Sequence, residues 1–93
     1  MTTLHIEHPV TDFIAWRTAF DGFAARRAQG GVTAERIQRP VDDDHYVLVD
    51  LDFPTRDHAE RFRGFLESAV WASPDASPAL AGTPQTRILQ PVP

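Results

Sequence analysis

The hydrophobic pattern is clearest in residues 45–53, where Val and Leu alternate with other side chains in a run typical of a β-strand. Successive side chains of a strand point to opposite faces of its sheet. One face of this strand is wholly apolar and carries Val47, Val49, Leu51 and Phe53. The other face carries Tyr46, Leu48, Asp50 and Asp52. Because Tyr46 and Leu48 are not polar, we expect a central strand whose second face is also covered, and we expect that cover to bear on function.

Three further segments are predicted to be strands. Residues 3–8 alternate between apolar and polar positions and stop at Pro9, which cannot donate to a sheet ladder. Residues 32–39 alternate imperfectly, which favours an edge strand with a bulge. Residues 86–92 are predicted to form the last strand, with Ile88 as its best core candidate.

Two segments show the spacing of an amphipathic helix. The first is predicted to begin at a cap formed by Thr11 or Asp12 and to stop at the two glycines 30–31. Its apolar stripe consists of Phe13, Trp16, Phe20 and Phe23. The second helix is predicted from about residue 56 to residue 71, with Thr55 as its N-cap.

The composition changes to Ala, Ser and Pro between residues 72 and 85. Residues 77–82 are predicted to form one capped helical turn, with Ser first, then Pro, and Gly at the end. A connection of this length in a small domain is typical of a functional loop, a lid or an interface arm. The alternative is a plain connection anchored by the packing of Leu80, and the sequence leaves both open.

The order of the elements predicts the fold. Strand, helix, strand, strand, helix, strand within one domain, residues 1–93, is the α+β ferredoxin-like βαββαβ pattern. Right-handed crossovers give a four-stranded antiparallel sheet with strands one and three in the middle and two helices on one face. Antiparallel pairing then places His5 beside Asp50 and Glu7 beside Leu48 on the open face.

Composition narrows the possible functions. The chain has no Cys, which removes disulfides and thiol chemistry, and all nine basic residues are Arg, so no Lys can form a Schiff base. A net charge of −4 with scattered Arg argues against nucleic acid as a partner. No apolar run exceeds four residues, so we expect no membrane span. His5, Glu7 and His8 stand where a signal peptide would need its apolar core, so the expected location is the cytoplasm.

The pattern supports neither of two conceivable metal sites. Residues 42–44 are three consecutive Asp without the alternate spacing, Gly and distal Glu of a calcium loop, so a solvated turn is predicted. His5, Glu7 and His8 have metal-binding side chains, but His8 points to the opposite side of a regular strand from His5. No metal and no cofactor are therefore expected.

The predicted open face also carries candidate chemistry. A carboxylate from Glu7 or Asp50 beside the His5 imidazole would orient it and suit proton abstraction from a phenol or enol. The resulting carbanion can react with oxygen without a cofactor, or close a ring. The simpler alternative is that these are polar residues of a wet dimer interface.

The chain resembles the dimeric α+β barrel superfamily, which includes antibiotic-biosynthesis monooxygenases, stress-responsive barrel proteins, polyketide-type cyclases and small haem-degrading enzymes. The resemblance rests on the element order, the Pro-rich segment before the last strand, and the residues His8-Pro9 and Asp12…Trp16…Phe20-Asp21. In such families two sheets pack open face to open face, with a ligand cavity in each subunit between sheet and helices. The haem-degrading members use an Asn, Trp, His constellation, and this sequence has no Asn.

The resemblance implies a homodimer formed through the open sheet face and a small apolar or aromatic ligand. It favours a cofactor-independent monooxygenase or cyclase acting on an aromatic or polyketide-like molecule. The alternative is a non-catalytic ligand-binding or structural barrel protein. The catalytic candidates are His5, Asp50 and Tyr46. The candidates for ligand contact are Glu7, Leu48, His58, Trp71 and Arg87.

Overall fold

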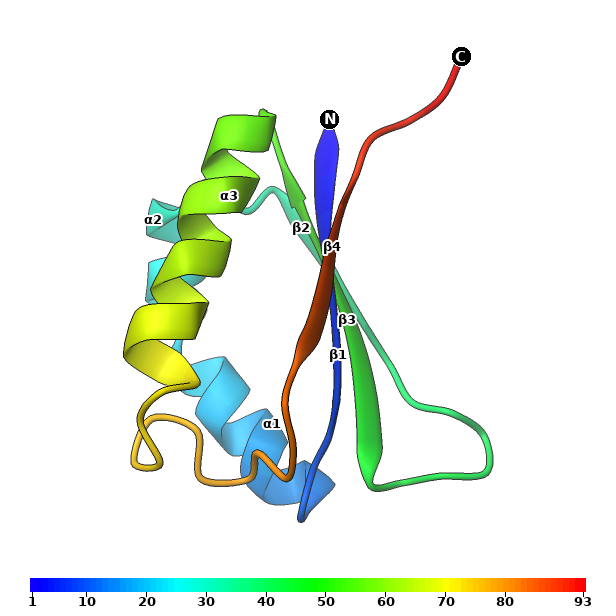
Figure 1. Cartoon of the computed structure of the whole chain (residues 1–93), viewed down its shortest axis with the longest axis vertical. Coiled ribbons are helices and arrows are strands. Elements are labelled where there is room, and N and C mark those ends of the chain that lie inside the picture. The colour runs from blue at the N-terminus through cyan, green and yellow to red at the C-terminus, as the bar shows by residue number, and fades with distance from the viewer.

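The computed structural model describes residues 1–93 as one four-stranded antiparallel sheet with helices on a single face (Figure 1). The strands are β1 (Thr2–Pro9), β2 (Ala34–Gln38), β3 (Tyr46–Phe53) and β4 (Gln85–Leu89). The helices are α1 (Phe13–Gly22), α2 (Ala24–Gln29), α3 (Arg56–Phe65) and the π-helical turn η1 (Leu66–Val70). The strand order β2-β3-β1-β4 confirms the predicted α+β ferredoxin-like fold. None of the helices combines the length and apolar character that crossing a bilayer requires.

The register of the central strands is the predicted one. His5 pairs with Asp50, and Glu7 pairs with Leu48, across β1 and β3. On the other side of β1, Arg87 of β4 lies opposite His5. The edge strand β2 pairs regularly with β3 over its five residues, so the predicted bulge is absent. The alternation of residues 32–39 looks irregular because the strand begins only at Ala34.

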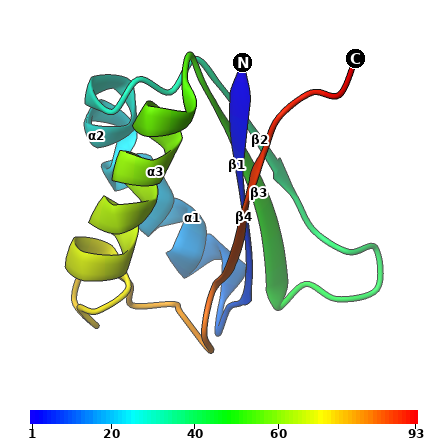
Figure 2. The ribbon, with the colours of Figure 1, turned by 45° about the horizontal axis from the view of Figure 1, so that its top comes forward.

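The core lies between the sheet and the helices. The helix-facing side chains of β1 and β3 are at most 5% exposed: Leu4, Ile6, Val47, Val49, Leu51 and Phe53. The rings of Phe53 and Phe62 lie 5.7 Å apart and join the sheet to α3. Both views show the opposite face of the sheet without any covering element (Figures 1 and 2). The chain therefore buries one side of its sheet and leaves the other side to a partner or to water.

The first predicted helix is broken in two. Asp12 caps it as expected and accepts a hydrogen bond from the Ile14 backbone N–H at 3.1 Å. The break falls at Phe23, whose backbone (φ −98°, ψ 13°) leaves the helical region directly after Gly22. Glycine has the lowest helix propensity after proline, and the tertiary contacts of α2 decide the new direction. The carbonyl of Phe20 accepts from the Phe23 N–H at 3.1 Å and also from the Arg27 guanidinium.

The second predicted helix ends in a wider turn. Thr55 caps it and accepts from the His58 backbone N–H at 3.3 Å. At its end the Trp71 N–H donates to the Leu66 carbonyl, five residues back, at 2.7 Å. This π-helical turn places Val70 in the interior, where it is 7% exposed.

The turn predicted at residues 77–82 is present as a single backbone turn, in which the Leu80 N–H donates to the Ser77 carbonyl at 3.2 Å, and it does not continue as a helix to Gly82. The segment also pairs with the end of β1: the Thr11 N–H donates to the Ala79 carbonyl at 2.9 Å, and Val10 forms an isolated bridge with Leu80. These contacts leave Ala79 only 2% exposed. The segment is thus an anchored connection, with Ala79 more deeply buried than Leu80.

We expect Gly31→Ala to lower the free energy of unfolding by about 1–2 kcal/mol. Gly31 has φ +93°, and a Cβ there would lie 2.8 Å from Cδ2 of His58. Gly64→Ala is the matched control, because nothing lies within 4 Å of its added Cβ and it sits in α3. That change is expected to stabilise the protein by up to about 1 kcal/mol. Urea unfolding followed by circular dichroism measures the free energy of unfolding of both variants. Equal changes in the two would contradict a specific need for glycine at position 31.

Candidate functional site

A hydrogen-bonded network crosses the open face of the sheet. The His5 ring lies between two carboxylates, with Nδ1 2.7 Å from Asp50 Oδ1 and Nε2 2.8 Å from Glu7 Oε2. The Tyr46 hydroxyl donates to the second oxygen of Glu7 at 2.7 Å. The structure therefore brings together the three catalytic candidates and Glu7, on adjacent strands and at the predicted positions.

The network fixes the protonation of His5. An ionised carboxylate only accepts hydrogen bonds, so an imidazole between two of them carries a proton on each nitrogen. The hydrogen bond to Glu7, helped by Asp50, raises the pKa of His5 above its usual value despite partial burial. The hydrogen bonds from His5 and then Tyr46 lower the pKa of Glu7. A doubly protonated imidazole offers no lone pair to a substrate, so this geometry favours the interface interpretation of His5 over a role as catalytic base.

We expect the ion pair between His5 and Glu7 to stabilise the fold most in mildly acidic solution. The pKa of His5 is raised in the folded state. Its contribution to the free energy of unfolding is therefore complete below the unfolded pKa of 6.5 and is lost as pH rises through the raised pKa. A lowered pKa means that the Glu7 contribution is present above 4.5 and is lost as pH falls through the lowered pKa. Urea titrations should show the largest difference between wild type and His5→Gln at about pH 5–6 and a smaller one at about pH 9.

The control for this experiment is His45→Gln, because the His45 side chain is 66% exposed. It should follow the wild-type pH profile. A His5→Gln profile parallel to that of wild type over the whole range would show that the network is not a coupled ionic one.

A second polar cluster lies on the same face, nearer the start of β1. Asp52 is only 4% exposed and receives two hydrogen bonds of 3.0 Å from the Arg36 guanidinium. The Thr3 hydroxyl donates a third, at 2.7 Å. Arg36, followed by Thr3, lowers the pKa of the Asp52 carboxyl. These groups satisfy one another, so the cluster holds the strands β1, β2 and β3 together and leaves no free donor or acceptor on Asp52.

An apolar cavity lies on the other side of the sheet, between the sheet and the helices. It is a cavity of about 80 Å³, measured as room for the centres of water molecules. Its walls come from β1, β3, all the helices and the segment 76–80. The apolar lining is Ile6, Trp16, Ala19, Phe20, Phe23, Val49, Leu51, Phe62, Phe65, Leu66, Val70, Trp71, Ala76, Pro78, Ala79 and Leu80. Only three polar side chains line it: His8, Arg27 and Ser77.

His8 presents a neutral imidazole to this cavity. It lies on the helix side of β1 and is 4% exposed. Its Nδ1 is 2.9 Å from the Pro9 carbonyl oxygen, which only accepts, so Nδ1 carries the proton. Burial lowers the pKa of His8 below its usual value, against the opposing effect of that hydrogen bond. Nε2 has no partner in the protein and is not sealed within it, so its lone pair is available to a bound molecule.

An aromatic wall runs along one side of the cavity. The rings of Trp16 and Phe20 stack at 4.9 Å, and His8 meets Trp16 edge-on at 6.3 Å. The Arg27 guanidinium lies over the Phe20 ring at 3.7 Å. Its Nε donates to Glu35 of β2 at 2.8 Å. One wall of the cavity therefore has an imidazole at one end and a guanidinium at the other.

The predicted site residues fall into three places. Trp71 lines the cavity. The network residues, with Leu48 and Arg87, lie on the open face and do not line it. His58 lies outside both, at the start of α3, where its Nδ1 is 2.6 Å from the Thr55 hydroxyl. His8 and Arg27 also line the cavity, and neither is among the site residues predicted from the sequence. The parity of β1 gives a signal for His8, because it points the same way as Leu4 and Ile6.

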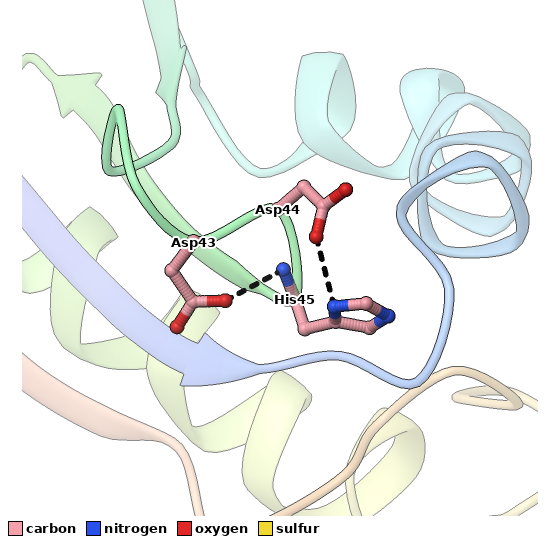
Figure 3. A group of neighbouring side chains, drawn as sticks. All are labelled: Asp43, Asp44 and His45. Atoms are coloured by element: carbon pink, nitrogen blue, oxygen red, sulfur yellow. Dashed lines mark hydrogen bonds and ion pairs between the residues drawn. The ribbon is translucent and has the colours of Figure 1, made fainter.

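The acidic turn before β3 is exposed, as predicted. Asp43, Asp44 and His45 offer ligand atoms within 4.8 Å of one another (Figure 3). Asp43 accepts from the His45 backbone N–H at 2.9 Å, and Asp44 lies 2.9 Å from the His45 ring (Figure 3). These local pairs account for the arrangement as a turn in solvent. The loop projects away from the helices, beyond the open face (Figure 1).

Comparison with solved structures confirms the ferredoxin-like fold, which structures described as antibiotic biosynthesis monooxygenases share. SnoaB, a cofactor-independent oxygenase from Streptomyces nogalater, matches with a TM-score of 0.75 and 21% identity over 99% of this chain and 93% of its own. An antibiotic biosynthesis monooxygenase matches with a TM-score of 0.70 and 9% identity over 100% of both chains. A dimeric ferredoxin-like protein from an uncultured marine organism matches with a TM-score of 0.59 and 11% identity over 95% of this chain and 94% of its own. No family model and no curated protein sequence matches the chain.

Proposed function

We propose that the protein is a cofactor-independent oxygenase that binds a small aromatic molecule between sheet and helices and uses His8 as its general base. One observation carries the proposal: an apolar cavity contains a single imidazole, whose unprotonated Nε2 has no partner in the protein. A general base must be unprotonated at working pH and within reach of the substrate. His5 has no unprotonated nitrogen to offer, because both of its ring nitrogens donate to carboxylates. It also lies on the other face of the sheet.

The chemistry requires a substrate that becomes electron-rich when it loses a proton. His8 Nε2 takes a proton from an activated ring CH₂ group, and the carbanion combines with dioxygen to give a peroxide anion. The imidazolium returns the proton to form a hydroperoxide, and loss of water leaves a carbonyl. The sum is CH₂ plus O₂ giving C=O plus H₂O, in which carbon is oxidised and dioxygen is reduced. The apolar walls exclude bulk water and so favour reaction of the carbanion with dioxygen over its reprotonation.

A second candidate is ligand binding without chemistry. It is favoured by the scarcity of polar groups, since His8, Arg27 and Ser77 are the only polar side chains in the lining. The Ser77 hydroxyl is already used, because it donates to the Ser73 carbonyl at 2.8 Å. No second donor is therefore placed beside His8 to stabilise a developing oxyanion.

The two candidates differ in their use of dioxygen. Binding of naphthols and anthrones is followed by quenching of the tryptophan fluorescence, since Trp16 and Trp71 line the cavity. Oxygen uptake and product formation are then measured in air and under nitrogen. We expect quenching in both atmospheres and an oxidised product only in air. Quenching without oxygen uptake would contradict the oxygenase and support ligand binding without chemistry. If no compound of the panel quenched the fluorescence, both candidate functions would be wrong.

We further propose that the protein is a cytoplasmic homodimer joined through the open face. Tyr46 and Leu48 lie on this face and are only half-buried in the single chain. Val41, fully exposed, sits in the loop that projects past the face (Figures 1 and 2). Apolar groups in these positions are typical of a surface that a partner covers. One of the structural neighbours is described as dimeric.

The charge of the open face supports a second copy of the same chain as that partner. Its acidic side chains are Glu7, Asp50 and Asp52, and its basic ones are His5, Arg36 and Arg87. With His5 protonated these charges balance, so two identical faces do not repel each other as a whole. Local pairs across a two-fold axis then set the orientation of the partners.

A further inference from the structure

Arg27 is the one charged side chain in the wall of the cavity, and its burial is unusual for an arginine. It is 6% exposed, in a chain whose other arginines all lie outside the core. Buried guanidinium groups are normally fully paired, because an unpaired charge in an apolar setting is costly. The pairing of Arg27 therefore indicates what the cavity accepts.

Two of the five N–H groups of Arg27 are used within the protein. Nε donates to Glu35, and Nη1 donates to the Phe20 carbonyl. The remaining N–H groups, one on Nη1 and two on Nη2, have no protein partner. Nη2 is not sealed within the protein, so a small molecule can reach it. Its counter-ion Glu35 is 38% exposed, so water weakens that ion pair more than it would weaken one formed inside the cavity.

We propose that the ligand is an aromatic acid whose carboxylate is bound by Arg27 and whose ring lies against Trp16 and Phe20. This proposal rests on the proposed function in one respect, the use of this cavity as the ligand site. Arg27 and His8 flank the two stacked rings of Trp16 and Phe20, whose centroids lie 4.9 Å apart. A carboxylate held at the Arg27 end thus directs the far edge of the ring system toward His8.

The test compares naphthoate with methylnaphthalene, in which a methyl group replaces the carboxylate. Binding to the full chain is followed by tryptophan fluorescence and by calorimetry. We expect naphthoate to bind at least ten times more tightly than methylnaphthalene. Arg27→Gln should reduce naphthoate affinity roughly 10- to 100-fold and change methylnaphthalene affinity less than about threefold.

Glu35→Gln separates recognition from structural support. This variant removes the counter-ion of Arg27 but keeps the guanidinium, so naphthoate affinity should rise. If the Arg27–Glu35 pair only supported the fold, both variants would weaken naphthoate and methylnaphthalene alike, which would overturn the proposal. Equal affinities of naphthoate and methylnaphthalene for wild type would also overturn the proposal, but they would leave the proposed function intact. If neither compound nor any member of the wider panel binds, the proposed function fails with it.

Discussion

Replacing His8 by Gln is expected to reduce oxygen-dependent turnover of a bound aromatic substrate by about 10²–10⁴-fold, the usual contribution of a general base. Gln keeps a polar side chain of similar length but has no nitrogen lone pair that can take a proton. The dissociation constant of the ligand should change little, because the apolar walls supply most of the binding. Single-turnover rates and fluorescence titrations separate the two effects.

His5→Gln is the matched comparison. The two histidines lie three residues apart on β1 and face opposite sides of the sheet. We expect His5→Gln to keep the chemical rate within about threefold of wild type, since its ring nitrogens are held by Asp50 and Glu7. If His5→Gln abolished turnover in a folded dimer and His8→Gln did not, the catalytic assignment would move to the open face.

The pH profile gives an independent check on His8. The base form is required, so the rate should fall as pH drops through the pKa of His8. Because burial lowers that pKa below 6.5, turnover should stay nearly constant from pH 8 to about pH 6.5 and fall only in more acidic solution. A fall centred above pH 6.5 would contradict a buried neutral imidazole.

Leu48→Arg is expected to convert the proposed homodimer into monomers, with a rise in the dissociation constant of at least about 100-fold. Leu48 lies near the middle of the open face, opposite Glu7 of β1 and Gln38 of β2. In the single chain an arginine there points to water and has Glu7 as a neighbour, so the monomer should stay folded. In the dimer it would bury a charge against an identical charge across the two-fold axis.

Light scattering reports the result directly, because wild type should show twice the 10.4 kDa of one chain and Leu48→Arg only one chain mass. Ile14→Asp is the control: Ile14 is 75% exposed and lies on α1, on the opposite side of the molecule. It should leave the dimer intact. A wild-type protein that is monomeric at micromolar concentration, or a dimer broken equally by both changes, would remove the open face as the interface.

The strands were predictable because strand parity is a local property. Once residues 45–53 show which positions are apolar, the same rule orients β1, and antiparallel pairing then places His5 beside Asp50. The helix break was not predictable from periodicity, because the apolar stripe continues from Phe20 to Phe23 across it. Likewise, local turn signals indicate the turn that closes at Leu80, but they cannot show that residues 79–81 pair with the end of β1, some 70 residues away.

The candidate site was only half visible in the sequence. The parity of β1 places His8 on the side opposite His5, with Leu4 and Ile6, but a histidine beside Glu7 and Pro9 at the end of a strand gives no sign of an apolar cavity. Arg27 carried no signal at all, because an arginine on an amphipathic helix normally lies in solvent. Its burial depends on the turn after Gly22, which directs α2 toward Glu35 of β2.

One wall of the cavity depends on the number of residues in the π-helical turn η1, and not only on the identity of its side chains. Each residue of an α-helix rotates the next by about 100°. The one extra residue accommodated in Leu66–Val70 therefore sets the direction in which Trp71 leaves the helix, toward the cavity. A single-residue deletion in this turn would restore a regular helix and rotate Trp71 by more than a quarter turn. Insertions and deletions here, which keep every ligand-contacting side chain in the sequence, are thus a simple evolutionary route to cavities of different size.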